Sequence, residues 1–321
     1  FGFTFKALRS EKPTTYIILA LLMQLCGIFP TEYFFGLEGL RFLFLLSFFQ
    51  GNLMDRFKKT IRHWWPYLVI WILNAVWLVY YYKFGPYNSY EVTASQSLTT
   101  LTFLREALDS LWKAGFYVWI QVLALTFKSL SAPASLLTLG LILFSFAFLA
   151  PYLKNIAQPE NNGENSFSLS LIVIGVLGIL LGRLPSLAAG LPLTLQSSYD
   201  RFMVSMMIGG SLFLLGFIEL LLKNNRVKTY VLATVIALGM GQQFFNANIF
   251  RRDWEKQRDI YWQMTWRIPA LEPNTVILTD QMPIDYETDI SFSAPINWMY
   301  APMVSGAESP RGDLPYLMLY T

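Results

Sequence analysis

The chain has very few of the side chains that build disulfide frameworks and metal centres. Its 321 residues include one cysteine, Cys26, and one histidine, His63. A single cysteine excludes a disulfide framework, and because Cys26 lies inside an apolar run we predict that it is a buried small apolar residue. The shortage of sulfur and imidazole ligands also argues against a zinc site or a histidine-ligated haem.

Charged residues are scarce as well. They make up 14% of the chain, about half of their share in an average soluble domain, whereas hydrophobic residues make up 54% and aromatic residues 17%. The net charge of +3 is small, and no basic and aromatic platform for nucleic acid accompanies it. We therefore expect membrane lipids, and no nucleic acid, as partners of this chain.

Apolar runs long enough to cross a bilayer, or nearly so, recur along most of the sequence. They cover residues 16–29, 42–49, 64–82, 116–127, 133–153, 167–182, 202–222 and 229–246. These runs predict an all-α polytopic integral membrane protein with about six to eight transmembrane helices. The clearest span is 64–82, which carries tryptophan and tyrosine at its two ends, as membrane-interface belts do.

Basic residues predict the side of the membrane on which each link lies, because cytoplasmic links are enriched in lysine and arginine. Such residues precede the first run, follow the second run and occur in the link at 223–228. Residues 31–39 would then face outward. Five runs separate the last two basic links, and this odd number of crossings would place the two links on opposite sides.

Residues 98–133 offer one solution to this conflict. The run 116–127 has twelve residues, whereas a straight span needs about 20. It follows residues 101–115, in which leucines at helical spacing predict an amphipathic helix on the membrane surface. We expect 116–127 to be re-entrant or to continue that helix. The alternative is that the basic signal of one link is overridden.

Residues 248–321 predict a small extracytoplasmic cap beside a transmembrane domain of residues 1–247. Apolar residues from Phe250 to Ile268 follow one face of an amphipathic helix, which Pro269 ends. The stretch NTVILTD then predicts a short strand. We expect irregular structure for the rest of the cap.

Four acidic residues of the cap lie close together in the sequence: Asp280, Asp285, Glu287 and Asp289. Their spacing does not follow the calcium-loop pattern, so we interpret them as solvated turn residues. At the other end, the chain begins at Phe1 and not at Met, which leaves open that residues precede it.

Three charged residues lie in the outward segment PTEYFFGLEGLRF: Glu32, Glu38 and Arg41. If residues 37–48 are helical, Glu38 and Arg41 are three positions apart on one face and can pair. Two interpretations are open, an ion pair at an outer helix end and a carboxylate that acts as a base or metal ligand at the outer leaflet. No combination of side chains in the sequence predicts a resident metal.

Asp200 and Arg201 stand directly before the run 202–222. Asp200 can accept backbone N–H bonds as the N-cap of a helix, and Arg201 can extend to the interface or bind a lipid phosphate. The functional alternative is an outward loop that is constrained by Pro185 and Pro192 and reaches Arg201. In that loop Arg201 would hold a phosphate or diphosphate while a carboxylate from another loop activates an acceptor.

Three patches carry a resemblance to known proteins. They are TEYFFGLEGLR, GRLPSLAAGLPLTLQSSYDRF, and YWQMTWRIPALEPNTVILTD followed by SAPINWMYAP. In their aromatic, proline and glycine patterns they resemble bacterial multispan proteins of uncharacterised function that are distantly similar to the C-type glycosyltransferases. The resemblance implies a bacterial plasma-membrane protein that transfers sugar from a polyprenyl-phosphate sugar to an envelope glycan at the outer face.

For the site, the resemblance implies that Glu38 or Glu32 deprotonates the acceptor or holds a divalent cation, and that Arg201 stabilises the departing phosphate. The chain departs from these enzymes in its first outward loop, where their catalytic acid usually lies. That loop is reduced here to PTEYFFGLEG. Either the acid lies in a missing N-terminal part, or Glu32 or Glu38 serves, or the chain is a non-catalytic relative.

The sequence is therefore compatible with two functions. The first is a relative of the lipid-linked-sugar glycosyltransferases, and the second is a non-catalytic scaffold or accessory subunit with membrane-protein partners. An enzyme needs a cavity of several hundred cubic ångströms, on the order of typical ligand sites, with Glu38 and Arg201 facing it. A scaffold would show these residues paired or facing lipid.

Overall fold

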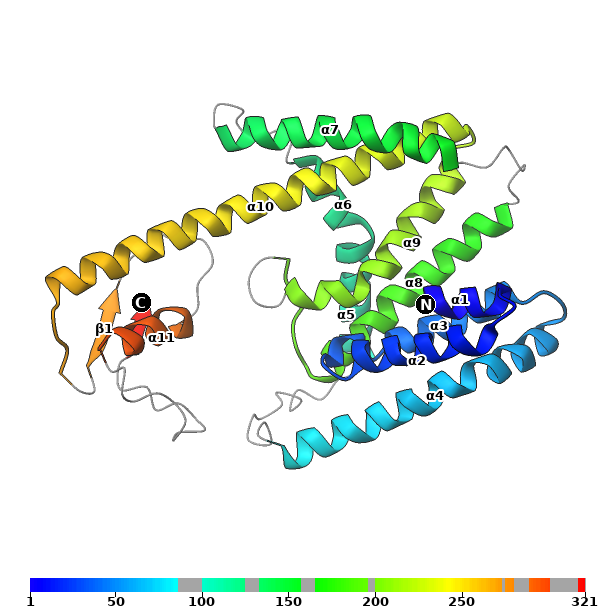
Figure 1. The fold of residues 1–321 in the computed structure, drawn as a ribbon, viewed down its shortest axis with the longest axis horizontal. Helices are drawn as coiled ribbons and strands as arrows, with labels where there is room; N and C mark the ends of the chain where they lie inside the picture. Colours follow the sequence, from blue (N-terminus) through cyan, green and yellow to red (C-terminus); the bar gives the residue numbers. More distant parts are fainter. Residues whose placement is uncertain are drawn as a thin grey trace. The chain divides into compact units, whose positions relative to one another are not determined.

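The computed structural model describes residues 1–85, 100–124, 133–156, 165–195, 200–272, 275–279, 289–300 and 317–320. The chain forms two compact units, the first built from residues 1–126 and 149–235 and the second from residues 127–148 and 236–321. Two helices, α7 (Pro133–Ile156) and α10 (Asn225–Arg267), belong in part to each unit (Figure 1). Helices make up most of the described chain, which confirms the all-α class.

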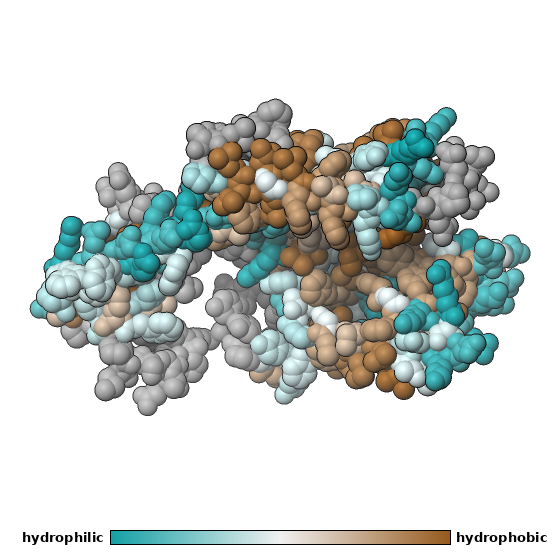
Figure 2. Space-filling view, turned by 45° about the horizontal axis from the view of Figure 1, so that its top comes forward, coloured by the Kyte–Doolittle hydropathy of each residue, from teal (hydrophilic) through white to brown (hydrophobic). Residues whose placement is uncertain are grey.

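Four helices of the described part are long and apolar enough to cross a membrane. They are Leu53–Tyr81 within α4 (Leu53–Phe84), α7, Phe167–Ala188 within α8 (Asn165–Ala188), and Asp200–Leu221, which joins the 3-10 helix η4 (Asp200–Phe202) to α9 (Met203–Leu221). These spans have the composition of a multi-pass integral membrane protein. Figure 2 shows wide areas of apolar side chains on the surface, and one of these areas belongs to α7.

Helix α10 is unbroken over 43 residues, which corresponds to about 65 Å at 1.5 Å per residue. Its predicted apolar part, 229–246, is not one of the four spans because Gln242, Gln243 and Asn246 lower its mean hydropathy. The helix ends at Arg267 as Pro269 predicts, since a residue that precedes proline is disfavoured in the α conformation.

The first unit begins with a small helical hairpin that packs on α4. It consists of α1 (Gly2–Arg9), α2 (Pro13–Ile28), the 3-10 helix η1 (Glu32–Phe34) and α3 (Leu37–Phe48). Gln24 donates to the backbone oxygen of Tyr67 at 3.0 Å, and Asn74 donates to that of Ile28 at 3.3 Å. These bonds give buried amides partners in an apolar environment and hold the hairpin against α4.

Helices α8 and α9 lie side by side (Figure 1) and touch through glycine. A Cβ atom on Gly209 would lie 2.3 Å from the backbone N of Ile179, and one on Gly182 would lie 2.4 Å from the backbone O of Ser205. The Ser205 hydroxyl donates to the Gly182 carbonyl at 2.8 Å. Small residues thus allow the close backbone approach that stabilises helix pairs in membranes.

A continuous helical stretch packs against α8 and α9. It consists of α5 (Thr100–Trp112), the π-helical turn η2 (Lys113–Tyr117) and α6 (Val118–Ala124). This confirms a helix at 101–112 and shows that the run from residue 116 continues it. The leucines Leu101, Leu104 and Leu108 are exposed, whereas the small residues Ala107 and Ser110 are buried. A position on the membrane surface stays a prediction.

The second unit contains the predicted strand, β1 (Val276–Thr279), which pairs in parallel with β2 (Leu317–Tyr320). The prediction of irregular structure is wrong for Asp289–Tyr300, which forms helix α11, and for Leu317–Tyr320, which forms β2. Phe292 and Ile296 recur at a spacing of four and pack against Tyr261 and Met264 of α10. This packing outweighs the helix-breaking tendency of Pro295. Asp280, Asp285 and Glu287 lie outside the described residues.

Cys26 is exposed on α2, so the prediction that it is buried is wrong. The buried residues of α2 are Ala20, Gln24 and Ile28, which follow one face at a spacing of four. Cys26 lies two positions after Gln24, about 200° around the helix axis, and therefore faces away from the hairpin core.

Candidate functional site

Glu38 and Arg41 are brought together on α3, as their spacing predicts. Glu38 Oε1 lies 2.8 Å from Arg41 Nε, and the two side chains are 2% and 6% exposed. The indole N–H of Trp64 donates to Glu38 Oε1 at 3.0 Å, and Arg41 donates to the hydroxyl of Thr4 at 2.6 Å. The guanidinium also lies 4.1 Å from the ring centroid of Tyr67. This arrangement joins α1, α3 and α4.

Burial raises the pKa of the Glu38 carboxyl, which lies outside the four spans, while Arg41 and the Trp64 hydrogen bond act in the opposite direction. Neither Glu38 nor Arg41 lines either of the two cavities of the first unit that flank residues 191–195. The geometry of this pair therefore suits an anchor between helices better than a group that meets a substrate.

The first of these cavities, the apolar cavity, has a volume of about 300 Å³. It lies between the turn that follows α2, the C-terminal part of α4 and the end of α8. Its walls are mostly apolar and aromatic: Tyr33, Phe35, Leu78, Pro185, Ala188, Ala189 and Leu191, with Glu32 and Ser186 as polar members. In the described part of the chain, no cationic side chain forms an ion pair with Glu32.

Tyr33 connects this cavity to Arg201. The guanidinium of Arg201 lies 5.8 Å from the centroid of the Tyr33 ring, and the ring of Phe202 contacts the same tyrosine at 4.9 Å between centroids. Phe202 is fully buried, whereas Arg201 is exposed. Tyr33, which follows the predicted site residue Glu32 in the chain, thus links the cavity wall to Arg201, a second predicted site residue.

Asp200 does not cap α9, so that interpretation is wrong. The α-helix begins at Met203 with Phe202 at its N-cap position, and no side-chain cap hydrogen bond forms. Asp200 instead opens the 3-10 turn η4 and is exposed. Asp200 therefore lies within the 3-10 turn, two positions before the N-cap residue of the α-helix.

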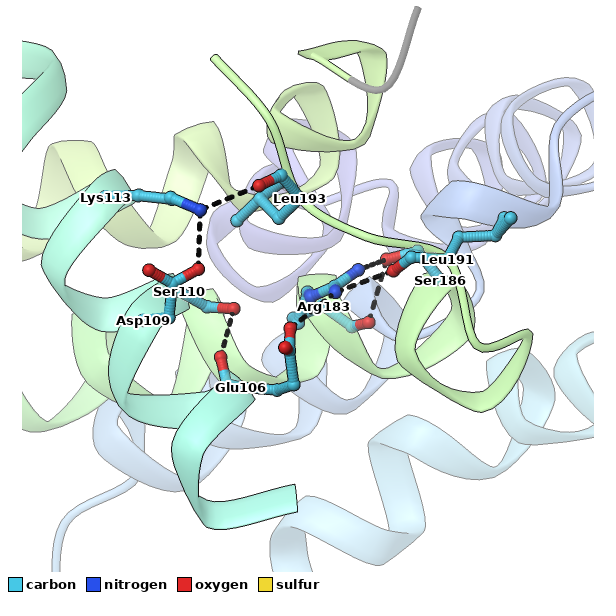
Figure 3. A network of polar contacts seen from close by, with 8 residues as sticks. All are labelled: Glu106, Asp109, Ser110, Lys113, Arg183, Ser186, Leu191 and Leu193. Carbon is cyan, nitrogen blue, oxygen red and sulfur yellow. Dashed lines mark hydrogen bonds and ion pairs between the residues drawn. The ribbon is translucent and has the colours of Figure 1, made fainter. Parts of the chain in front are cut away.

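A polar network lies beside the apolar cavity and centres on Arg183, a residue of the α8 span that is 1% exposed (Figure 3). Its guanidinium donates to Ser186 Oγ at 2.6 Å and to the Leu191 carbonyl at 2.8 Å. It also pairs with Glu106 of α5 at 3.2 Å. An arginine at this depth needs such partners, because an unpaired charge in an apolar environment is strongly unfavourable.

Lys113 also connects α5 to the segment that follows α8 (Figure 3). Its ammonium lies 2.6 Å from Asp109 Oδ2 and donates to the Leu193 carbonyl at 2.7 Å. Arg183 and Lys113 therefore each join an acid of α5 to a carbonyl of the segment 191–195. This segment follows α8 and is fixed in place by the two cations.

The second cavity, the polar cavity, has a volume of about 500 Å³ and lies where α5, η2 and α6 meet the segment 191–195. Its lining combines polar and aromatic side chains with two leucines: Asp109, Trp112, Lys113, Tyr117, Gln121, Leu193, Thr194 and Leu195. Leu191 lines the apolar cavity and Leu193 lines the polar one. The same fixed segment therefore contributes to both.

Four residues of this network were not predicted as site residues: Arg183, Glu106, Asp109 and Lys113. The predicted apolar run ends at residue 182, which leaves Arg183 in a loop. A usable signal is present in α5 and the start of η2, where acidic and basic residues at 106, 109 and 113 form a stripe opposite the leucines. In the described part of the chain, no group of three potential ligands is placed to hold a metal ion.

No protein-family model, curated protein or solved structure matches this chain.

Proposed function

We propose that the chain is a membrane-embedded transferase that uses a polyprenyl-phosphate sugar, as its resemblance to relatives of the C-type glycosyltransferases implies. One observation carries the proposal. Glu32 lines an apolar cavity and has no ion-pair partner among the described residues, and its neighbour Tyr33, also on the cavity wall, contacts the exposed guanidinium of Arg201. A lipid-linked phosphate has the matching chemistry, an apolar chain and an anionic head.

Each part of the site has a role in this reaction. The apolar cavity takes the part of the lipid chain nearest to the phosphate, and Arg201 binds the phosphate oxygens, for which a guanidinium is well suited. Glu32 accepts the proton of the acceptor hydroxyl as the acceptor oxygen bonds to the anomeric carbon. The bond from that carbon to the phosphate oxygen breaks, and Arg201 stabilises the charge that develops on the leaving phosphate.

Glu38, Arg41 and Asp200 have other roles in this proposal. The pair of Glu38 and Arg41 anchors α3, so Glu32 is the acid that remains for catalysis. Asp200 directly precedes Arg201, and no proton transfer is assigned to it. A divalent cation would have to be held by the substrate phosphate and Glu32, since the described residues offer no larger ligand group.

The proposal includes a topology of six to eight spans in the bacterial plasma membrane with the C-terminal cap outside. Two contacts support a common side of the membrane for the first two basic links, which the basic residues predict to be cytoplasmic. Arg9 lies 5.7 Å from the Phe48 ring, and Arg56 donates to the Leu46 carbonyl, so two basic links meet at one end of α3. In a Cys26→Ser background, which removes the exposed native thiol, an Arg267→Cys variant should react with a membrane-impermeant maleimide on intact cells. Reaction only after permeabilisation would place the cap inside.

Turnover tests the role of Glu32. The protein in nanodiscs would be given a set of polyprenyl-phosphate hexoses and a purified envelope glycan, and the release of polyprenyl phosphate would be measured. We expect Glu32→Gln to lower the rate by about 100-fold or more, because Gln cannot accept the proton. Glu255→Gln, on the exposed part of α10, is the matched control and should retain the wild-type rate. Equal rates for Glu32→Gln and wild type would contradict the proposal.

A second function, a scaffold in a membrane complex, is favoured by a different observation. Glu38 and Arg41 are locked in an ion pair, and large apolar side chains are exposed on several helices. Such surfaces can be covered by lipid or by other subunits. The absence of turnover together with stoichiometric co-purification of other subunits would favour the scaffold.

A further inference from the structure

The polar cavity is not used by the lipid-phosphate site and has a chemistry of its own. Its helical wall is a row of residues at a spacing of four: Asp109, Lys113, Tyr117 and Gln121. In a regular α-helix, each step of four residues advances about 40° beyond a full turn, so three steps would rotate the row by about 120°. In a regular α-helix, Gln121 would therefore point away from a cavity that Asp109 faces.

The π-helical turn η2 corrects this drift. It covers Lys113–Tyr117, and its hydrogen bonds join residues five apart, so a step of four residues no longer completes a turn. The other side of the turn, Ala114 and Gly115, is buried against α9, where a Cβ on Gly210 would lie 2.8 Å from the Ala114 carbonyl. Packing on α9 thus holds the turn that aligns the cavity wall.

The polar groups of the cavity are numerous but carry almost no net charge. Asp109 and Lys113 neutralise each other. The hydroxyl oxygen of Thr194 is buried and has no hydrogen-bond partner among the described residues, and Gln121 offers both a donor and an acceptor. This combination suits a neutral ligand with several hydroxyl groups, each of which donates and accepts, better than a phosphate.

Two aromatic side chains add flat apolar surfaces. Trp112 is 53% exposed and Tyr117 is 38% exposed, and both line the cavity. Aromatic rings pack well against flat apolar faces while their polar edges form hydrogen bonds. A pyranose ring presents one face of C–H bonds and an edge of hydroxyl groups, and a volume of about 500 Å³ lies within the range of small-molecule sites.

We propose that the polar cavity binds a saccharide, with a pyranose ring stacked on Trp112 or Tyr117 and hydroxyl groups bonded to Asp109, Gln121 and Thr194. The inference rests on the proposed function in one respect, because it identifies the cavity as the acceptor subsite of that reaction. Leu191 and Leu193 line the two cavities from positions two residues apart, a separation of at most about 7 Å along the chain. The two cavities therefore lie on either side of one short segment, which is the arrangement that an acceptor subsite beside the lipid site requires.

Saccharide binding can be measured without turnover. The protein in phosphatidylcholine nanodiscs, free of glycolipid and sugar detergent, would be mixed with the methyl pyranosides of glucose, galactose, mannose and N-acetylglucosamine. Saturation-transfer NMR should show magnetisation transfer to the ring protons of at least one probe. Trp112→Leu and the isosteric Thr194→Val should each weaken binding by about tenfold, the value of one aromatic contact or hydrogen bond.

The control is Trp266→Leu, which removes a tryptophan that is 73% exposed in the second unit and should leave binding unchanged. No transfer to any probe in the wild type, or equal binding by wild type, Trp112→Leu and Thr194→Val, would overturn the inference. If binding fails while turnover still depends on Glu32, only the saccharide cavity is wrong. If binding succeeds while Glu32→Gln retains turnover, the lipid-phosphate site is wrong and the saccharide cavity stands.

Discussion

Glu38 and Arg183 illustrate two ways in which this protein holds a charge away from water. Glu38 has its partner Arg41 three residues away on the same helix, whereas Arg183 finds Glu106 on a different helix. The first pair follows from helical spacing and was predicted from the sequence. The second depends on how α5 packs against α8, which no local pattern reveals. For Asp200 the local pattern was misleading. Aspartate is a good N-cap residue, but here it begins a 3-10 turn and does not cap α9.

The anchoring role of Glu38 makes a prediction about stability. Glu38→Gln keeps an acceptor for Trp64 but leaves Arg41 buried without a counter-charge, so we expect a loss of about 3 kcal/mol in the free energy of unfolding. Thermal unfolding in nanodiscs, followed by circular dichroism, measures it.

The control for this prediction is Glu255→Gln, which breaks the exposed pair with Arg251 and should change stability by less than about 1 kcal/mol. A Glu38→Gln protein as stable as the control, but without turnover, would show that Glu38 acts in catalysis and that the anchor interpretation is mistaken.

At the scale of elements, apolar periodicity predicted most helices, and the β-branched run in NTVILTD predicted β1. Two helical features were missed for physical reasons. The π turn at Lys113–Tyr117 is set by packing on α9, and α11 is stabilised by Phe292 and Ile296 in spite of Pro295. The cavities were also beyond prediction, because each is lined by segments that are distant in the sequence and whose approach depends on tertiary packing.

The contact between α8 and α9 gives an element-scale prediction. Gly209→Ala would place a Cβ 2.3 Å from the backbone of Ile179, so the helices must separate, and we expect a loss of about 1–3 kcal/mol. The polar network would loosen with it, because Arg183 belongs to α8. The apparent melting temperature in nanodiscs measures the effect.

Gly239→Ala is the matched substitution, since a Cβ at Gly239 meets nothing within 4 Å and alanine favours helix. It should be neutral or slightly stabilising. Equal melting temperatures for the two variants would mean that α8 and α9 do not pack as closely as described.

For the whole molecule, the four apolar spans and the two cavities of the first unit support one account. In the proposed function, the spans embed the chain in a membrane, the apolar cavity would receive a lipid chain, and Arg201 would bind its phosphate. The second unit contributes a long helix, α10, and a small cap whose core is built on Phe292 and Ile296. The account requires that the first unit binds a lipid phosphate by itself, without other subunits.

Native mass spectrometry of the detergent-extracted protein with added polyprenyl phosphate tests this claim most directly. We expect a monomer or small homo-oligomer that carries one lipid per chain. Arg201→Gln should retain the adduct at least about tenfold more weakly, as expected for loss of a charge-assisted contact, whereas Arg252→Gln, an exposed arginine of α10, should match the wild type. A wild-type chain that carries no lipid phosphate and persists in a stoichiometric complex with unrelated subunits would contradict the account.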